Sequence, residues 1–277
     1  MHRSLRTRLV GVLVGCVLTL PLAVMSAPAD AVTTVNPNRG ADISWPECPP
    51  TVGIPLRRGQ GKPMPSPSTG FVILGLTNGP GFTANPCIAT QLVFVRAYRM
   101  PIAAYAMTTY PTRSQLRKYG GHGPWPTTTT LGRLSNAGAA EARYNVVTMI
   151  SLGIRTPIVW IDIESYPPWD WTTNHAKNAA VVKGAVWAYQ KAGYRVGFYS
   201  STYMWSKILG SAGPRGYPEW RTVGASTSRA ALARCSTASF AGGRAVLSQW
   251  WTTTKDYDLL CPAYATVVSR SRYFSVT

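Results

Sequence analysis

The sequence predicts an α/β protein whose strands close into an irregular (β/α)8-type, TIM-like barrel. Apolar, strand-like runs alternate with longer segments of helical period between residues 40 and 260. Several of these runs are continuously apolar, which is typical of parallel strands covered by helices. About eight strands with intervening helices in a chain of this length favour the barrel. An open doubly wound sheet is the alternative, although no GxGxxG or P-loop pattern supports a nucleotide site in it.

The individual elements follow from residue type and periodicity. The expected strands cover 40–44, 71–77, 101–107, 156–164, 195–201, 220–226, 245–251 and 257–260. The expected helices cover 87–98, 136–153, 174–193 and 202–210. Thr173 or Asn174 is suited to cap the third helix, and Gly193 to end it.

Some of the chain exceeds what a minimal barrel needs. The stretches 51–69 and 108–135 are rich in Pro, Gly, Thr and basic residues, so we expect long rim loops there. The tail 264–277 is expected to add one more strand. No internal repeat is present, and residues 32–277 are expected to form a single domain.

Residues 1–31 have the pattern of a secretory signal peptide. A basic start and an apolar core precede Ala29-Asp30-Ala31, a small-x-small cleavage site. We therefore expect a secreted, extracellular protein. A membrane anchor is one alternative, but the apolar run of about 17 residues is short for a span and contains Pro21. Lipidation at Cys16 is another, although the sequence after it stays apolar.

The processed chain is strongly basic. Without residues 1–31 it keeps 25 basic and 9 acidic residues, a net charge of +16. Such a charge attracts anionic polymers, including bacterial wall polymers, extracellular DNA and acidic lipid surfaces; solubility alone is the alternative. No basic run has the spacing of a nucleic-acid-binding helix, so no specific nucleic-acid partner is predicted. We expect a monomer.

Four cysteines remain after processing: Cys48, Cys87, Cys235 and Cys261. An even number in an exported chain indicates two disulfides, for which the sequence allows three pairings. In the expected barrel, the first two lie near adjacent strands on one rim and the last two flank the final strands, which favours 48–87 and 235–261. No CxxC or His-rich spacing is present, so neither a metal site nor a cofactor is predicted.

Two carboxylates end the apolar run 156–164. Asp162 and Glu164 are two residues apart, so they point to the same side of a strand. In a parallel barrel the C-terminal strand ends form the active-site face. Two nearby carboxylates raise each other's pKa, so one keeps its proton while the other is charged, as glycosidic bond cleavage requires. A structural ion pair with Arg or Lys is the alternative.

Two further acids belong to the first and last expected strands. Asp42 lies in GADISW and Asp258 in DYDLL. These strands are neighbours in a closed barrel, so the sequence predicts that all four acids meet at one rim. A turn or cap role is the alternative for Asp42.

The order of segments GADISW, FVILGLTNGPGFTANP, IAAYAM, IVWIDIES, VGFYSSTYMW, VLSQWW and DYDL resembles the glycoside hydrolase family 25 lysozymes over most of residues 40–261. The pieces DISWPECP, FTANPC, NAAVVKGA, CSTASFAGG and DYDLLC are similar to an actinobacterial secreted branch. The resemblance implies a barrel that cleaves the β-1,4 bond between N-acetylmuramic acid and N-acetylglucosamine. Thr77-Asn78-Gly79 departs from the family's Thr-Glu-Gly turn, and 108–135 has no clear counterpart.

The same resemblance implies roles for the acids. Glu164 corresponds to the general acid and Asp162 to its carboxylate partner, with Asp42 and Asp258 as flanking rim acids. In this hypothesis Glu164 protonates the leaving oxygen. Asp162 orients the 2-acetamido group or stabilises the positive charge at the anomeric carbon, so retention and inversion are not distinguished.

Candidate substrate-binding residues lie in or beside the expected rim loops: Trp45, Asn78, Trp169, Trp171, Tyr199 and Trp250. Flat aromatic faces suit the C–H faces of sugars, and Trp169 and Trp171 directly follow the acids. Barrel packing is the alternative for Trp160 and Trp250, and a turn cap is the alternative for Asn78.

Three classes of function are consistent with these features. The predicted function is hydrolysis of cell-wall glycan. A non-catalytic carbohydrate- or wall-binding protein on the same barrel is the alternative, and adhesion to anionic polymers through charge is a third. The presence of both Asp162 and Glu164 favours the enzyme over the binding protein.

Overall fold

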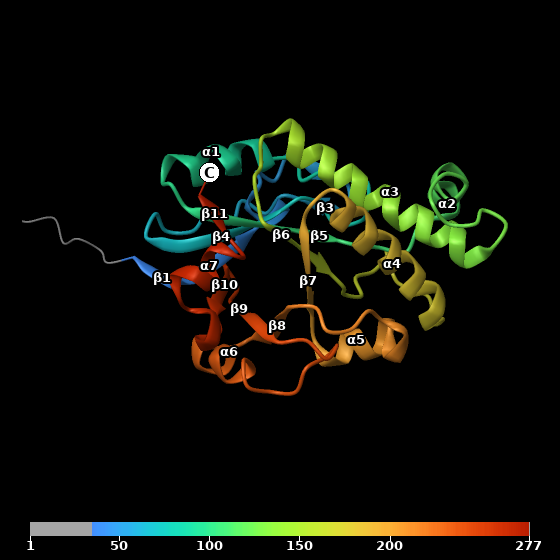
Figure 1. Cartoon of the computed structure of the whole chain (residues 1–277). Coiled ribbons are helices and arrows are strands. Elements are labelled where there is room, and N and C mark those ends of the chain that lie inside the picture. Colours follow the sequence, from blue (N-terminus) through green and yellow to red (C-terminus); the bar gives the residue numbers. More distant parts are fainter. Residues whose placement is uncertain (1–34, 277) are drawn as a thin grey trace, which may run out of the picture. The chain divides into compact units, whose positions relative to one another are not determined.

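The computed structural model describes residues 35–276 of the chain. The signal-peptide prediction for residues 1–31, with its alternatives at Pro21 and Cys16, lies outside the described residues. Everything below concerns the unit that follows them (Figure 1).

Eight strands close into a barrel, which confirms the predicted fold class (Figure 1). They are β1 (Asn36–Ile43), β4 (Thr69–Gly75), β5 (Pro101–Met107), β6 (Ile158–Asp162), β7 (Arg195–Ser200), β8 (Glu219–Ala225), β9 (Ala245–Trp251) and β10 (Asp256–Leu260). Strand pairing follows chain order and closes between β10 and β1. Neighbours from β1 to β9 are parallel, but β10 is antiparallel to both of its neighbours. The barrel is therefore irregular at its last strand.

Helices lie outside the ring of strands (Figure 1). They are α1 (Ile88–Ala97), α2 (Arg113–Tyr119), α3 (Thr130–Ser151), α4 (His175–Lys191), α5 (Thr202–Ile208), α6 (Ser228–Arg234) and α7 (Val267–Ser271). Asn174 caps α4 by accepting from the backbone N of Lys177 at 3.0 Å, and Gly193 follows the helix with φ of 89°. None of the helices within residues 35–276 combines the length and hydrophobicity needed to cross a bilayer.

Two loop and strand predictions were wrong. The stretch 108–135 contains α2 and the start of α3, because Thr112 and Gln115 form a capping box and Thr129 caps the second helix. The tail 264–277 forms mainly α7, which Thr266 caps, and only the two-residue strand β11 (Ser275–Val276) pairs with β5. Both errors come from reading Thr as a loop or strand former where it begins a helix.

The strands are buried on both faces. In β4, Phe71 and Ile73 pack inside the barrel with Trp160, whereas Val72 and Leu74 contact the helices. This explains the continuously apolar runs. Trp160 is fully buried, so the packing interpretation applies to it.

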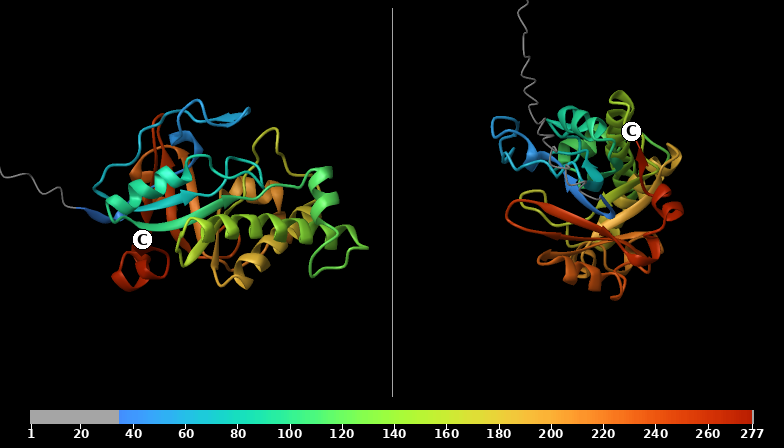
Figure 2. Two further views of the ribbon diagram at one scale, coloured as in Figure 1. Left: turned by 90° about the horizontal axis from the view of Figure 1, so that it is seen from above. Right: turned by 90° about the vertical axis from the view of Figure 1, so that its left-hand side faces the viewer.

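The loops at one end of the barrel are the long ones. The C-terminal ends of the parallel strands and the N-terminal end of β10 meet at this end. The segment 44–62, which carries the hairpin of β2 (Gly53–Ile54) and β3 (Arg57–Arg58), projects from it. The loop after β6 and the β9–β10 turn project from the same end (blue, yellow and red in Figure 2). They surround the mouth of the barrel.

Both predicted disulfides are present, Cys48–Cys87 and Cys235–Cys261, with Cα–Cα distances of 5.7 and 5.5 Å. They span 39 and 26 residues of sequence. The first ties the segment 44–62 to the start of α1. The second ties the end of α6 to the end of β10.

Removing either disulfide should destabilise the fold. Loop entropy predicts a loss of about 4 kcal/mol in the free energy of unfolding for Cys48→Ser with Cys87→Ser, and about 3.5 kcal/mol for Cys235→Ser with Cys261→Ser. Denaturant unfolding without reductant measures both. An unchanged midpoint in either double variant would show that the cross-link does not restrain the unfolded chain.

Candidate active site

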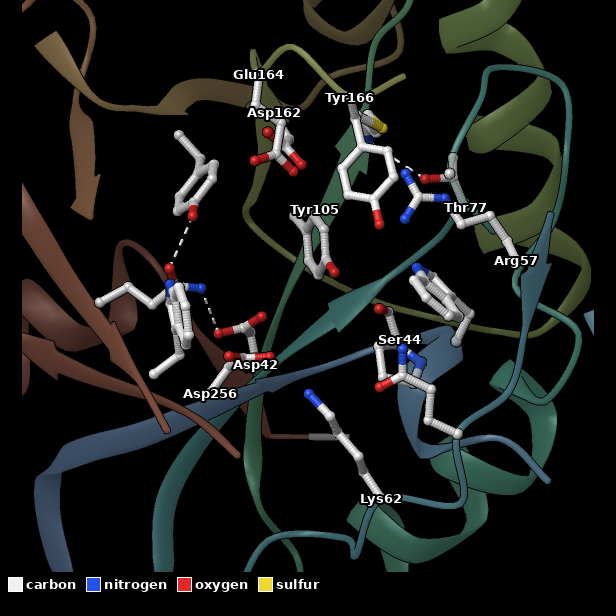
Figure 3. Close-up of a pocket in the computed structure, with 18 of the residues that line it drawn as sticks. Asp42, Ser44, Arg57, Lys62, Thr77, Tyr105, Asp162, Glu164, Tyr166 and Asp256 are labelled. Atoms are coloured by element: carbon white, nitrogen blue, oxygen red, sulfur yellow. Dashed lines mark hydrogen bonds between the residues drawn. The ribbon is translucent and has the colours of Figure 1, made fainter. Parts of the chain in front are cut away.

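A cavity of about 430 Å³ opens at the mouth of the barrel (Figure 3). Four carboxylates line it: Asp42, Asp162, Glu164 and Asp256. Aromatic, cationic and amide side chains complete the lining, among them Trp45, Arg57, Lys62, Tyr105, Tyr166, Tyr199, Gln249 and Trp251. Residues distant in the chain thus share one acidic cleft with aromatic walls.

Asp162 and Glu164 point into this cavity from one side (Figure 3). Asp162 is the last residue of β6, where it pairs with Met107 of β5, and its side chain is buried. The charge of Glu164 acts on its carboxyl, and its Oδ1 has no hydrogen-bond partner in the part of the chain that is described. The only ion pair within residues 35–276 joins Arg221 to Glu219, so the ion-pair alternative does not apply to the two acids.

Burial and mutual repulsion keep a proton on this pair. Burial, with the Glu164 charge as the next cause, raises the pKa of Asp162 well above its ordinary value. Burial also raises the pKa of Glu164, but the nearby Arg57 guanidinium opposes this. The pair therefore holds a proton at a pH where exposed carboxyls have lost theirs. Such a pair can deliver a proton to a bound group.

Asp42 enters the cavity from the opposite side (Figure 3). Its Oδ2 accepts from Gln249 Nε2 at 2.9 Å, and Gln249 Oε1 accepts from the Tyr199 hydroxyl at 2.8 Å. Burial, followed by the charges of Asp258 and Asp256, raises the pKa of Asp42 well above its ordinary value. This hydrogen-bonded chain fixes the direction of the Asp42 carboxyl.

The structure does not place Asp258 at the mouth as predicted. Its side chain is fully buried below the cavity, where Oδ1 accepts from Trp220 Nε1 at 2.7 Å, and burial raises its pKa to about 8. Because β10 runs antiparallel, residues nearer its start lie closer to the mouth. Asp258 pairs with Gly40, and Asp256, two residues earlier, lines the cavity near Asp42. The sequence analysis missed Asp256 because it assumed a parallel last strand.

Two of the predicted sugar-contact residues line the cavity, a third lies behind Arg57, and a fourth supports the loop after β6. Trp45 and Tyr199 line the cavity, and Trp169 packs near Arg57, 5.1 Å from its ring centroid to the guanidinium carbon. Trp171 does not line it: its Nε1 donates to the backbone oxygen of Glu164 at 3.1 Å, which fixes the loop after β6.

Trp250 and Asn78 are not placed for contact with a ligand in this cavity. Trp250 is 7% exposed and stacks on Tyr257 outside the barrel, whereas Trp251 is 43% exposed and lines the cavity. Neighbouring residues of a strand face opposite sides, so one of two adjacent tryptophans faces the cavity and the other faces away from it. The sequence does not show which of the two faces the cavity. Asn78 is buried, and its side chain bonds to the β2–β3 hairpin, where its Oδ1 accepts from Ile54 N at 2.8 Å.

Several residues of the site were not predicted. Arg57 and Lys62 come from the segment 44–62, Tyr105 from β5 and Tyr166 from the loop after β6. Tyr105 has a raised pKa because of burial. In PIAAYAM, residues 103 and 105 face the barrel interior, so strand alternation gave a signal for Tyr105. Nothing in the sequence places a loop residue over a barrel. Within residues 35–276, no three His, Cys, Asp or Glu side chains form a group suited to a metal ion.

Glu141 of α3 is a buried carboxyl behind the rim loops. Its Oε1 accepts from the backbone N of Thr109 at 3.1 Å, and its carboxyl packs against Gly81, where a Cβ would lie only 2.2 Å from Oε1. Burial raises its pKa from 4.5 to about 8. This carboxyl is therefore neutral in the folded protein at neutral pH and holds the loops after β4 and β5 together.

Glu141 should make stability fall as pH rises from about 4.5 to 8. In this range the unfolded carboxyl releases its proton while the folded one keeps it, so the folded state binds more protons and the free energy of unfolding decreases. Above pH 8 this contribution stays constant. Glu141→Gln should remove up to about 4 kcal/mol of this decrease. Urea unfolding at pH 5 and pH 8 measures it, and equal pH slopes for both proteins would contradict the assignment.

The fold and the cavity define a barrel protein with an acidic cleft. Residues 87–220, just under half of the chain, match the family model described as Lysozyme-like protein 1. No curated protein sequence matches the chain. The matched residues run from the start of α1 into β8.

A muramidase and a lysozyme of known structure share the fold at low sequence identity. The muramidase from Acremonium alcalophilum is 16% identical with a TM-score of 0.53, over 84% of this chain and 99% of that one. A family GH25 lysozyme from Aspergillus fumigatus is 13% identical with a TM-score of 0.53, over 86% and 99%. The modular autolysin LytC from Streptococcus pneumoniae is 10% identical with a TM-score of 0.47. That comparison covers 80% of this chain and 46% of LytC, so this chain spans less than half the length of LytC.

Proposed function

We propose that the protein is a secreted glycoside hydrolase of the muramidase type that cleaves the glycan strands of peptidoglycan. The observation that carries the proposal is the buried pair of Asp162 and Glu164, which faces an open cavity without an ion-pair partner among the described residues. A carboxyl pair that holds a proton beside further negative charge is what cleavage of a glycosidic bond uses. The shared fold with muramidases supports the proposal.

In the proposed mechanism Glu164 transfers the proton to the leaving oxygen. Glu164 is half-buried and Asp162 is buried, so Glu164 is the one that reaches a ligand, and the proton of the pair passes through it. After the transfer both carboxyls are charged. They then face the positive charge that develops at the anomeric carbon as its bond to the leaving oxygen breaks, or Asp162 orients the 2-acetamido group. Water adds to this carbon and returns one proton to the carboxyl pair. Asp42 and Asp256 add negative charge on the opposite side of the cavity.

The proposal extends to the setting of the protein. The resemblance in sequence favours an actinobacterial secreted branch, and the predicted signal peptide and both disulfides are consistent with an extracellular protein. The net charge of +16 after processing favours contact with the anionic cell wall. We propose cell-wall polysaccharide as the partner and a monomer as the working state.

A non-catalytic wall-binding protein on the same barrel is the competing proposal. One observation favours it: Asn78 stands where the resembling family has a Glu, and it is buried in the hairpin contact instead of facing the cavity. The chain therefore lacks one rim carboxylate that the family pattern leads one to expect.

The identity of the new reducing end tests the proposed reaction. Purified peptidoglycan is incubated with the protein, reduced with borohydride and analysed by mass spectrometry. The proposal predicts products that end in N-acetylmuramitol. Ends in N-acetylglucosaminitol would contradict the muramidase assignment, and no new ends with retained pelleting on walls would favour the binding protein.

A further inference from the structure

We infer that the segment 44–62, here named the flap, adds to the cleft a binding site for a carboxylate on the glycan, and that Arg57 is the residue that contacts this carboxylate. The inference rests on the proposed function and specifies the substrate class of the same site. The flap follows β1, where the minimal barrel needs only a short connection. It carries the short hairpin β2–β3.

The flap is held in place before any ligand binds. The Cys48–Cys87 disulfide joins it to the start of α1. Asn78 accepts from Ile54 N at 2.8 Å and donates to the backbone oxygen of Arg57 at 3.0 Å. Gly61 N donates to the oxygen of Cys48 at 2.9 Å and closes the base of the flap. A pre-organised wall of this kind loses little entropy when a ligand binds.

The two arginines of β3 point in opposite directions. Arg57 is 3% exposed and lines the cavity. Arg58 is exposed and donates to the backbone oxygen of Thr51 at 2.9 Å, on the solvent side of the hairpin. Strand alternation therefore directs one guanidinium into the cleft and leaves the other in water.

Arg57 is buried among aromatic rings without an acceptor for its Nε. The guanidinium carbon lies 5.2 Å from the ring centroid of Trp45 and 5.1 Å from that of Trp169, and Tyr166 lies against its face (Figure 3). Its Nε has no hydrogen-bond partner within residues 35–276, and the ion pair found there does not involve it. The Nε is shielded from solvent beside Gly79, so a ligand in the cavity approaches the terminal nitrogens of the guanidinium. No salt bridge among the described residues engages them, and a buried donor without an acceptor is costly, so they leave a place for an acceptor from a ligand.

A carboxylate fits this place best. A guanidinium offers parallel N–H donors that match the two oxygens of a carboxylate, and the aromatic rings keep its plane fixed. The Arg57 guanidinium lies close enough to Glu164 to lower the pKa of that carboxyl, but the two side chains form no ion pair. Muramic acid differs from glucosamine by a lactyl group that ends in a carboxyl, whereas chitin is neutral. The cleft should therefore prefer glycans with a carboxylate over neutral ones.

Equilibrium binding to three glycans tests the inference. Asp162→Asn serves as the background, since it keeps the Glu164 charge beside Arg57, and mass spectrometry checks that the glycans stay intact. The probes are peptide-free muramyl oligosaccharides with free lactyl carboxylates, the same glycans with their peptides attached, and chitin oligomers of equal length. Arg57→Met is compared with Arg58→Met, which removes the same charge from the solvent side of the hairpin.

We expect Arg57→Met to weaken binding of a carboxylate-bearing glycan about tenfold to hundredfold, while binding of chitin oligomers changes less than about threefold. Arg58→Met should leave all three affinities unchanged. Loss confined to the peptide-free glycan assigns the lactyl carboxylate, and loss confined to the peptide-bearing glycan assigns a carboxylate of the peptide. Either supports the inference, whether or not the wild-type protein turns over.

Two outcomes would overturn the inference. One is an equal loss of affinity for all three glycans in Arg57→Met, which would make Arg57 a structural residue of the cleft wall. The other is no change in any affinity. Arg57→Lys keeps the charge without the forked donors, so it guards against a folding defect: it should bind chitin oligomers like the background and recover only part of the carboxylate preference.

Discussion

Glu164→Gln should abolish glycan hydrolysis while leaving the fold and wall binding intact. Glutamine keeps the size of the side chain but has no proton to transfer to the leaving oxygen. General acid catalysis contributes about 10²- to 10⁴-fold, so kcat should fall by about 10³-fold. Release of reducing ends from peptidoglycan measures this. KM should change little, since the contacts with Arg57, Trp45 and Tyr199 are retained.

Asp170→Asn is the matched control for this variant. Asp170 lies in the same loop after β6, is exposed and accepts from the Ser165 hydroxyl at 2.6 Å, but it does not line the cavity. Its activity should stay within about twofold of the wild type, since exposed substitutions change little. Wild-type activity in Glu164→Gln would show that another group supplies the proton.

Glu219→Gln should lower the free energy of unfolding by about 3–5 kcal/mol, the largest stability effect we expect from one substitution. Glu219 is fully buried, and its Oε2 lies 2.7 Å from Arg221 Nε. Its Oε1 accepts from the backbone N of Ala241 at 2.9 Å and of Gly243 at 3.0 Å. Removing the charge leaves Arg221 buried without a counter-ion.

Denaturant and thermal unfolding measure this effect. For a domain of this size the loss corresponds to a decrease in Tm of about 10 °C. Replacing Glu219 and Arg221 together by Met should cost less than the sum of the single replacements, because no unpaired charge remains. Additive losses would show that the two side chains stabilise the fold independently. Arg229→Ala, on the exposed side of α6, should be close to neutral.

The barrel could be predicted because its strands are buried on both faces. Continuous apolar runs identified 101–107 and 245–251 with the bounds that the structure has. Short helices were harder to predict, since α2 and α6 have only seven residues each and depend on caps by Thr112 and Thr227. Seven residues give few turns in which to recognise a periodicity, although α5, which is equally short, was predicted at 202–210.

The candidate site could be predicted only where the direction of the strand was known, and which of its residues face the barrel mouth. Asp162 ends a parallel strand and Glu164 follows it, and both line the cavity. Asp256 was missed in favour of Asp258 because the sequence does not show that β10 is antiparallel. Trp251 was missed in favour of Trp250 because both faces of β9 are apolar.

Arg57 could not have been predicted from the barrel pattern. It belongs to the flap, whose place over the mouth depends on the Cys48–Cys87 disulfide and the contact with Asn78. Both contacts join residues more than 20 positions apart, and local periodicity carries no information about them. Tertiary contacts of this kind decide how a loop insertion is placed.

The most direct test of a catalytic cleft is a turnover measurement with wild-type protein on soluble, peptide-free glycan strands. Reducing ends are counted against the amount of protein over time. We predict many ends released per protein molecule, at a rate proportional to protein concentration. Saturable binding of the strands with no ends released would contradict catalysis by Asp162 and Glu164 and leave a glycan-binding barrel.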